Sequence, residues 1–328
     1  PPVYLPDWAA RQANAMEFSL ISAVSERDPR ITGLEAPSTI PPHGLRQRCI
    51  HDLPMILPAS MLGNMTRSTS PVILLLIFLW AAAFGSNATS NAMGPSILDP
   101  RSGEILEADI MWWHNVLSML QEWITVQTGV VRPEARGVAL PDSLMGDAMR
   151  FVACHEVGHS LGLRHNMMGS WAFPTDSLRS KTFTDRMNST SSSIMDYARF
   201  NYVAQPGDGI KALSPHIGPY DMFAIEYGYR WYGKQTPEEE KELLQDFLAK
   251  HTDRLYKYSE AQDPRDAVDP RAQNEDLGDD PIRSSQYGIA NLKCIVPQII
   301  QWTTTGEKGQ TYEEASRLYY AVINQWNN

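Results

Sequence analysis

The chain has 328 residues, enough for one large domain or two modest ones, and enough to bury a sizeable core. Hydrophobic residues make up 43% and aromatic residues 9%, which excludes a chain that is disordered throughout. The formal net charge of −10 excludes nucleic acid as an expected partner, because phosphate binding calls for a basic surface.

Residues 1–91 form an irregular N-terminal part with no sustained helix or strand period. Residues 72–85 are continuously apolar. An apolar run of about 14 residues is shorter than the roughly 20 needed by a membrane-spanning helix. We therefore expect a buried strand or core helix there and no stable membrane span. The chain begins at Pro1, so we expect a fragment or processed piece, for which a missing signal peptide means little.

Residues 92–232 have a locally consistent pattern, and we expect them to form the core domain. Residues 103–112 predict one short strand. Apolar residues at helical spacing over 113–124 predict a helix. A second helix is expected over 142–161, ended by Gly162, because glycine readily takes the left-handed conformation that closes helices.

Residues 233–328 are expected to form a separate helical subdomain. Thr236 and Thr311 each begin a capping box, with a glutamate three residues later and an amphipathic stretch beyond. Between them, residues 263–280 are acidic and punctuated by proline. A solvated linker is favoured there over a calcium site, because the carboxylates lack the spacing of a known calcium loop.

The chemistry concentrates in residues 154–166, CHEVGHSLGLRHN, which hold three of the chain's eight histidines. His155 and His159 are four residues apart. On a helix, both imidazoles can then reach one cation at roughly 2.0–2.1 Å. Glu156 lies about 100° around the helix from His155, too far to join the ligand set but close enough to contact a water on the metal. This spacing predicts a metal site with an adjacent base.

Gly162 ends the helix, which allows His165 to approach from another side as the third ligand. Three protein ligands leave a fourth position open, as is typical of catalytic rather than structural zinc sites. Zinc lowers the pKa of a bound water to about 7, so Glu156 can accept its proton and pass it to the leaving amine. The alternative is three histidines satisfied in a core, which requires the whole pattern to arise by chance.

The order HEVGHSLGLRH at residues 155–165 resembles the signature of the metzincin metalloproteases. That family also has a methionine in a tight turn beneath the metal, and Met195 lies thirty residues after His165. Tyr197 matches the position where astacin-like and serralysin-like metzincins carry a tyrosine that reaches the metal or stabilises the oxyanion. A packed aromatic residue of the turn is the alternative for Tyr197.

From about residue 91 to its end, the chain is also similar to bacterial secreted Met-zincin-type metalloproteases with flanking domains of unknown function. The resemblance implies an α/β (α+β) catalytic domain, with a twisted mixed sheet over the zinc helix, and a helical C-terminal subdomain. It also implies a zinc-dependent metalloendopeptidase that acts on protein or peptide substrates and is secreted, periplasmic or on the cell surface. Residues 1–91 depart from the family pattern, and either a frameshift or true divergence accounts for this.

Two other functions stay open: a catalytically impaired zinc-holding module, and hydrolysis of a small amide. The intact Glu156 argues against the first. We expect Cys154 to be a small buried residue, and His114 and His216 to be surface or capping residues. The specificity pocket is expected along residues 198–203. No oligomeric state is predicted.

Overall fold

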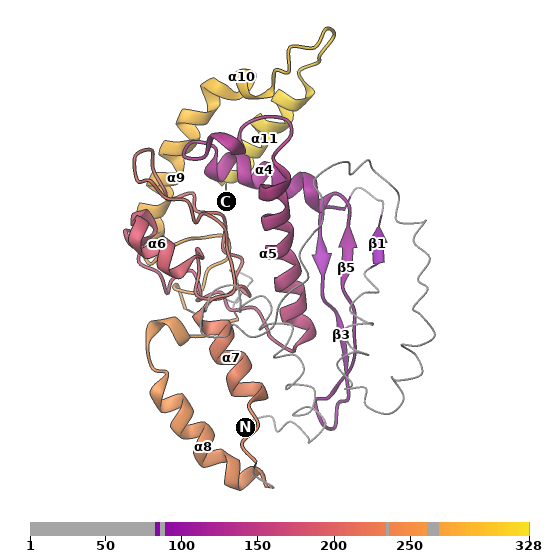
Figure 1. Cartoon of the computed structure of the whole chain (residues 1–328), viewed down its shortest axis with the longest axis vertical. Coiled ribbons are helices and arrows are strands. Elements are labelled where there is room, and N and C mark those ends of the chain that lie inside the picture. The colour runs from indigo at the N-terminus through magenta and orange to yellow at the C-terminus, as the bar shows by residue number, and fades with distance from the viewer. Residues whose placement is uncertain (1–82, 86–88, 234–235, 261–268, 328) are drawn as a thin grey trace, which may run out of the picture. The chain divides into compact units, whose positions relative to one another are not determined.

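The computed structural model describes residues 83–85, 89–233, 236–260 and 269–327 (Figure 1). The irregular part expected at residues 1–91 lies outside the described residues, apart from residues 83–85 and 89–91. The apolar run is therefore seen only where it ends, in strand β1 (Ala83–Gly85). Within the described ranges, no helix is both long enough and apolar enough to cross a bilayer.

Short strands form two small sheets in the described part of the chain. In the mixed sheet, β1 pairs in parallel with β5 (Met111–Trp113), whose other side pairs antiparallel with β2 (Ala92–Met93). β3 (Ser96–Leu98) and β4 (Ile105–Ala108) pair antiparallel with each other. The prediction of one strand over 103–112 was wrong, because β4 and β5 pair with different partners and separate at residues 109 and 110.

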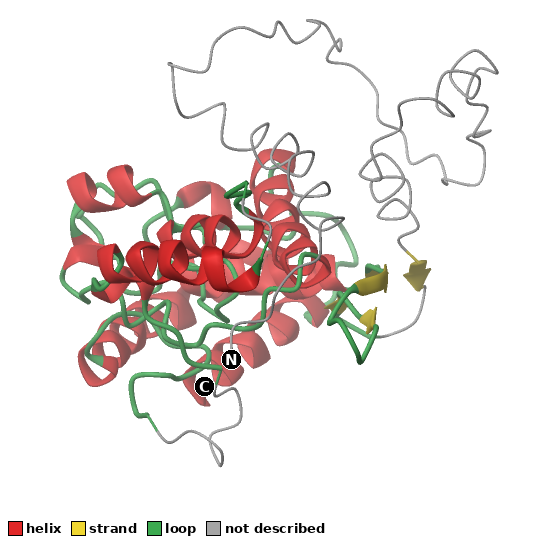
Figure 2. Ribbon diagram, turned by 90° about the horizontal axis from the view of Figure 1, so that it is seen from below, coloured by secondary structure: helices red, strands yellow, loops and turns green. Residues whose placement is uncertain are grey.

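Helices supply most of the described fold, and Figure 2 shows them to one side of the strands. They are α4 (Val116–Thr128), α5 (Asp142–Ser160), α6 (Lys181–Met187), α7 (Pro219–Tyr229), α8 (Pro237–Lys250), α9 (Pro281–Ile295), α10 (Ile299–Thr303) and α11 (Glu313–Asn327). Single 3-10 turns lie at Pro133–Ala135, Ser177–Arg179, Arg254–Tyr256 and Val296–Gln298. The helices predicted over 113–124 and 142–161 are confirmed as α4 and α5, although Trp113 belongs to β5.

One of the two predicted capping boxes is confirmed. The Thr236 hydroxyl accepts from the Glu239 N–H, and the Glu239 carboxylate accepts from the Thr236 N–H, at the start of α8. The second was placed wrongly, because α11 begins at Glu313 and Thr311 therefore lies two residues before the helix.

Helix α4 is shared by two apolar cores. Its residues Val116, Leu120 and Ile124 pack with α5 and with the segment around Met195. Its last turn contributes Val126 to a second core, formed otherwise by α9, α10 and α11. The mixed α/β architecture with a helical C-terminal part is thus confirmed. Helices α9 and α11 pack on the same α4 that supports α5, and the domain boundary at 233 stays a prediction.

Candidate metal centre

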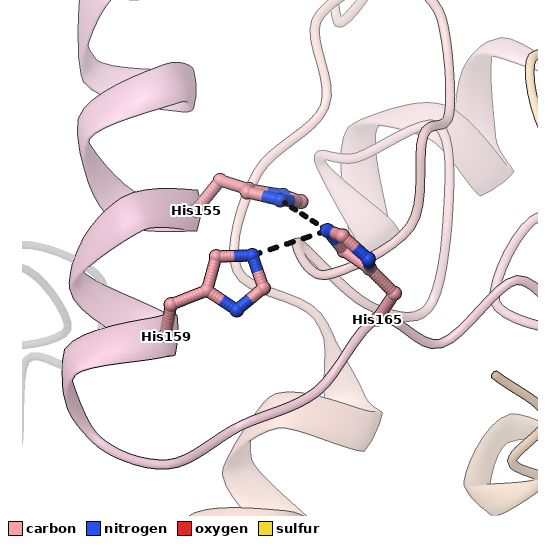
Figure 3. A group of neighbouring side chains, drawn as sticks. All are labelled: His155, His159 and His165. Carbon is pink, nitrogen blue, oxygen red and sulfur yellow. Dashed lines mark hydrogen bonds between the residues drawn. The ribbon is translucent and has the colours of Figure 1, made fainter. Parts of the chain in front are cut away.

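Helix α5 and the turn after it bring the three predicted histidines together. His155 and His159 lie one helical turn apart on α5. The helix ends at Ser160, and Gly162 follows with φ of +84°, a conformation that strains any residue with a Cβ. The chain turns there and returns His165 beside the helix (Figure 3). The predicted helix stop at Gly162 is therefore confirmed.

The Nε2 atoms of the three rings face a common centre. His165 Nε2 lies 3.2 Å from His155 Nε2 and 3.1 Å from His159 Nε2 (Figure 3). Nitrogens bound to one tetrahedral zinc at roughly 2.0–2.1 Å would lie about 3.3 Å apart. Among the described residues, these histidines are the group of three metal-type side chains close enough to hold one ion.

The hydrogen bonds of the Nδ1 atoms determine which ring nitrogen carries the proton and which one keeps a lone pair for a metal. His155 Nδ1 lies 2.7 Å from the Ile194 carbonyl oxygen, and His159 Nδ1 lies 3.0 Å from that of Leu163. A carbonyl oxygen only accepts, so each Nδ1 carries the proton and each neutral ring keeps a lone pair on Nε2. His165 Nε2 holds at most one proton. That proton cannot make a full hydrogen bond to the lone pairs of both His155 Nε2 and His159 Nε2. A cation at the centre satisfies all three nitrogens, so the residues fit a metal ion.

Burial keeps these rings in the form that binds metals. It lowers the pKa of His155 to about 3, and the neighbouring His159 acts in the same direction. Burial also lowers the pKa of His159. Metal ligands must be neutral imidazoles, so no proton has to be displaced from these two rings at neutral pH.

Glu156 lies next to the histidines and is 6% exposed. Burial raises the pKa of its carboxyl to about 7, which is suited to a group that both accepts and returns a proton. Room for the carboxylate depends on Gly94, just after β2. A Cβ built there would lie 3.2 Å from Glu156 Oε2 and 2.7 Å from the Glu156 carbonyl oxygen. The sequence analysis did not identify Gly94 as part of the site.

Met195 lies directly against α5. A Cβ added at Gly158, inside the histidine motif, would overlap the Met195 Sδ atom. The turn that carries Met195 is held by Asp221 of α7, whose carboxylate accepts from the Ser193 hydroxyl and the Ile194 N–H, both at 2.7 Å. The sequence analysis also missed Asp221. The pair Gly218–Pro219 marks the start of a helix in the sequence, and Asp221 lies in the first turn of that helix.

Tyr197 also lies beside the predicted ligands. Its ring centroid is 4.6 Å from that of His165 and 5.7 Å from that of His155. The ring therefore packs against two of the three histidines. Its position keeps both of its predicted roles open: a tyrosine that acts in the site, and a packed aromatic residue of the turn.

Asn166, the residue after the third histidine, ties the site to the C-terminal part of the chain. It is fully buried, and its N–H donates to the Met195 carbonyl at 3.0 Å. Its side chain donates to the Lys257 carbonyl and accepts from the Ser259 N–H. The sequence analysis missed this residue, because Lys257 and Ser259 lie more than ninety positions away.

A pocket of about 510 Å³ opens beside the histidines. Its lining residues are Asn91, Ala92, Met93, Gly94, Pro95, Val116, Met119, Trp123, Phe151, Val152, His155, Glu156, His159, His165, Tyr197, Ala198, Arg199 and Glu275. Of the segment expected to wall a specificity pocket, residues 198 and 199 line it, whereas 200–203 do not. The end of β2 and the residues after it form another part of the wall.

The remaining predicted residues lie outside the metal group. Cys154 is half-buried against the α4–α5 core, and burial raises the pKa of its thiol. His114 is exposed, whereas His216 joins Asn188 to Asp147 by hydrogen bonds from both ring nitrogens. The acidic side chains of the described residues 269–280 form no group of three metal-type ligands, and the calcium question stays as the sequence left it.

One comparison with known proteins agrees with this geometry. A family model described as Met-zincin matches residues 137–328, more than half of the chain. The matched region contains the three histidines, Glu156, Met195 and Tyr197. No curated protein and no solved structure matches the chain.

Proposed function

We propose that the chain, which belongs to the Met-zincin family, is a zinc-dependent endopeptidase that hydrolyses peptide bonds in protein or peptide substrates. Family membership supports a zinc metalloprotease at the general level. The observation that carries the proposal is the set of three facing Nε2 atoms beside the buried Glu156, in an open pocket.

In the proposed mechanism, His155, His159 and His165 would hold the zinc ion, which when bound would act as a Lewis acid towards the peptide carbonyl and would lower the pKa of water to about 7. Glu156 accepts the proton of the attacking water and returns it to the nitrogen of the leaving amine. The carbonyls that accept from the two Nδ1 atoms fix the tautomer and the direction of the rings.

Two further elements support binding of an extended chain. Among the described strands, β2 lies at the edge of its sheet, and it lines the pocket beside Glu156. A peptide can add to such an edge through main-chain hydrogen bonds, which places its carbonyl groups along the pocket. We assign the Tyr197 hydroxyl to stabilisation of the oxyanion, because its ring packs on His155 and His165.

Metal analysis combined with cleavage of an unfolded protein such as casein tests the proposal. The wild-type chain should bind one zinc ion and cleave casein, and a chelator should abolish cleavage. Glu156→Ala should keep the zinc and lose cleavage by about 10²–10⁴-fold, because only the proton transfer is removed. Bound zinc without Glu156-dependent cleavage would instead support a zinc-holding module. Cleavage of short amides but not of extended peptides would support the small-amide alternative.

A further inference from the structure

A pair of opposite charges forms part of the pocket wall. Besides Glu156, the ionic side chains among the described lining residues are those of Arg199 and Glu275, which form an ion pair with each other. The Arg199 guanidinium carbon also lies 3.7 Å from the centre of the Trp123 ring. Arg199 is 8% exposed, so its position is fixed by packing on both sides.

Apolar side chains from two helices also line the pocket. Val116, Met119 and Trp123 come from α4, and Phe151 and Val152 come from α5. The two helices pack on each other in the main core, so these side chains have little freedom to move apart. A substrate side chain that enters between them exchanges water for hydrocarbon contacts.

Glu275 is held in place by a strained backbone. Its φ is +66°, and a residue with a Cβ takes this conformation only when the surrounding structure imposes it. The residues that follow supply the constraint. Asp276 accepts from the Ser170 hydroxyl at 2.9 Å, and the Leu277 N–H donates to the Tyr202 hydroxyl at 3.1 Å. The carboxylate is thus fixed at the pocket by the C-terminal part of the chain.

We propose that the Arg199–Glu275 pair makes this pocket select a large uncharged side chain, aliphatic or aromatic, of the substrate residue beside the scissile bond. This inference rests on the proposed function and names the substrate class of the same site. A carboxylate that entered would meet Glu275, and an ammonium group would meet Arg199. Either would also lose its hydration in an apolar pocket, because the charges of the wall already satisfy each other.

The pair favours this inference over an anion receptor built on Arg199. A substrate carboxylate could bind the guanidinium only by displacing Glu275, which would leave that carboxylate without its partner in a partly buried position. The same reasoning excludes Glu275 as a receptor for lysine, since Arg199 would be left uncompensated between Trp123 and the apolar wall.

Binding of peptide hydroxamates to the zinc-loaded full chain tests the inference without requiring turnover. In a matched series, the hydroxamate binds the metal and the adjacent side chain is leucine, glutamate or lysine. The leucine compound should bind at least about tenfold more tightly than either charged one, measured by calorimetry. Equal affinities, a preference for either charged compound, or no binding of the leucine compound would overturn the inference.

Two variants, each of which removes one charge of the Arg199–Glu275 pair, provide a second test. Glu275→Gln keeps the size of the side chain and leaves Arg199 uncompensated, so the glutamate compound should gain about tenfold relative to the leucine one. Arg199→Gln should produce the mirror result, a similar gain for the lysine compound. Unchanged ratios in the folded variants would overturn the inference, and the wild-type order decides it if a variant does not fold.

These results are distinguishable from failure of the proposed function. A chain that binds the leucine compound selectively but does not cleave casein in a Glu156-dependent way keeps the pocket inference and loses the endopeptidase. A chain that cleaves casein but binds the three compounds equally keeps the endopeptidase and loses the pocket inference.

Discussion

The metal-binding part of the pocket and its Arg199–Glu275 part are built in different ways. The histidines lie within eleven residues on one helix and the turn after it. Arg199 and Glu275 lie 76 residues apart, and Trp123, on which Arg199 stacks, belongs to a helix that precedes both. The first part needs a helix and a glycine, whereas the second needs three segments that are distant in sequence to pack correctly.

The histidine part of the pocket also depends on residues that are distant in sequence. His155 is oriented by the Ile194 carbonyl, and Asn166 is bound to Lys257 and Ser259. Substitutions far from the histidine motif in sequence can therefore weaken metal binding. The following variants separate the contribution of the motif from that of its supports, in order of expected effect.

Removal of a ligand should have the largest effect. His159→Ala takes one of the three nitrogens from the centre, and zinc affinity should fall by on the order of 10²-fold or more, beyond the effect of losing an outer support. Competition with a chelating indicator measures this affinity. His216→Ala is the control, since His216 lies outside the metal group, and zinc loss in that variant would contradict the assignment.

Removal of the support at Asn166 should weaken the histidine part of the pocket from outside it. Asn166→Ala leaves the Lys257 carbonyl and the Ser259 N–H without this partner, so the free energy of unfolding should fall by about 2–3 kcal/mol. Zinc affinity should fall by about 10–100-fold, because His165 loses its anchor.

The matched control for this variant is Asn291→Ala. Asn291 is also buried and donates to two backbone carbonyls, those of Tyr202 and Ala204, away from the histidines. It should lose similar stability in urea unfolding and keep its zinc affinity. If both variants lost zinc equally, Asn166 would have no specific positioning role.

A methyl group between α5 and Met195 tests how closely the motif fits the turn beneath it. Gly158→Ala should lower the free energy of unfolding by about 1–3 kcal/mol, because the added Cβ overlaps Met195 Sδ. Gly146→Ala lies on the same helix, and apart from its chain neighbours and the helix's own backbone no atom lies within 4 Å of the added Cβ. It should stabilise by up to about 1 kcal/mol through helix propensity. Equal effects of the two variants in urea unfolding would show that Met195 does not constrain the helix.

A charged contact away from the pocket should have the smallest effect, and it depends on pH. Burial alone would raise the pKa of Asp147, but hydrogen bonds from His216 and Ser214 outweigh it and lower that pKa to about 2. The unfolded value is about 3.9, so the ionised Asp147 stabilises the fold above roughly pH 4, and this contribution disappears as the pH falls to about 2.

Asp147→Asn should therefore lower the free energy of unfolding at pH 7 by about 1 kcal/mol. The difference from the wild type should shrink as the pH falls below about 4. Urea unfolding of both proteins across this range measures the difference. A difference that stayed constant down to pH 2 would show that the Asp147 charge does not contribute to stability.

Much of the fold around the motif was predictable because its determinants are local. Apolar spacing fixed α4 and α5, and Thr236 with Glu239 fixed the start of α8. Errors occurred where neighbours in space decide the outcome. Residues 103–112 form one strand-like stretch rich in apolar residues, but they divide into β4 and β5 because each segment has a different pairing partner.

The sequence alone determined where the candidate metal centre lies, because His155, Glu156, His159, Gly162 and His165 are placed by helix geometry and one left-handed turn. Only the tertiary structure decided what surrounds that centre. Gly94 next to Glu156, Asn166 against Ser259, and Glu275 against Arg199 join residues whose separation along the chain leaves no periodic signal. Such contacts follow from packing of the whole chain, and packing is where the choice of substrate is proposed to lie.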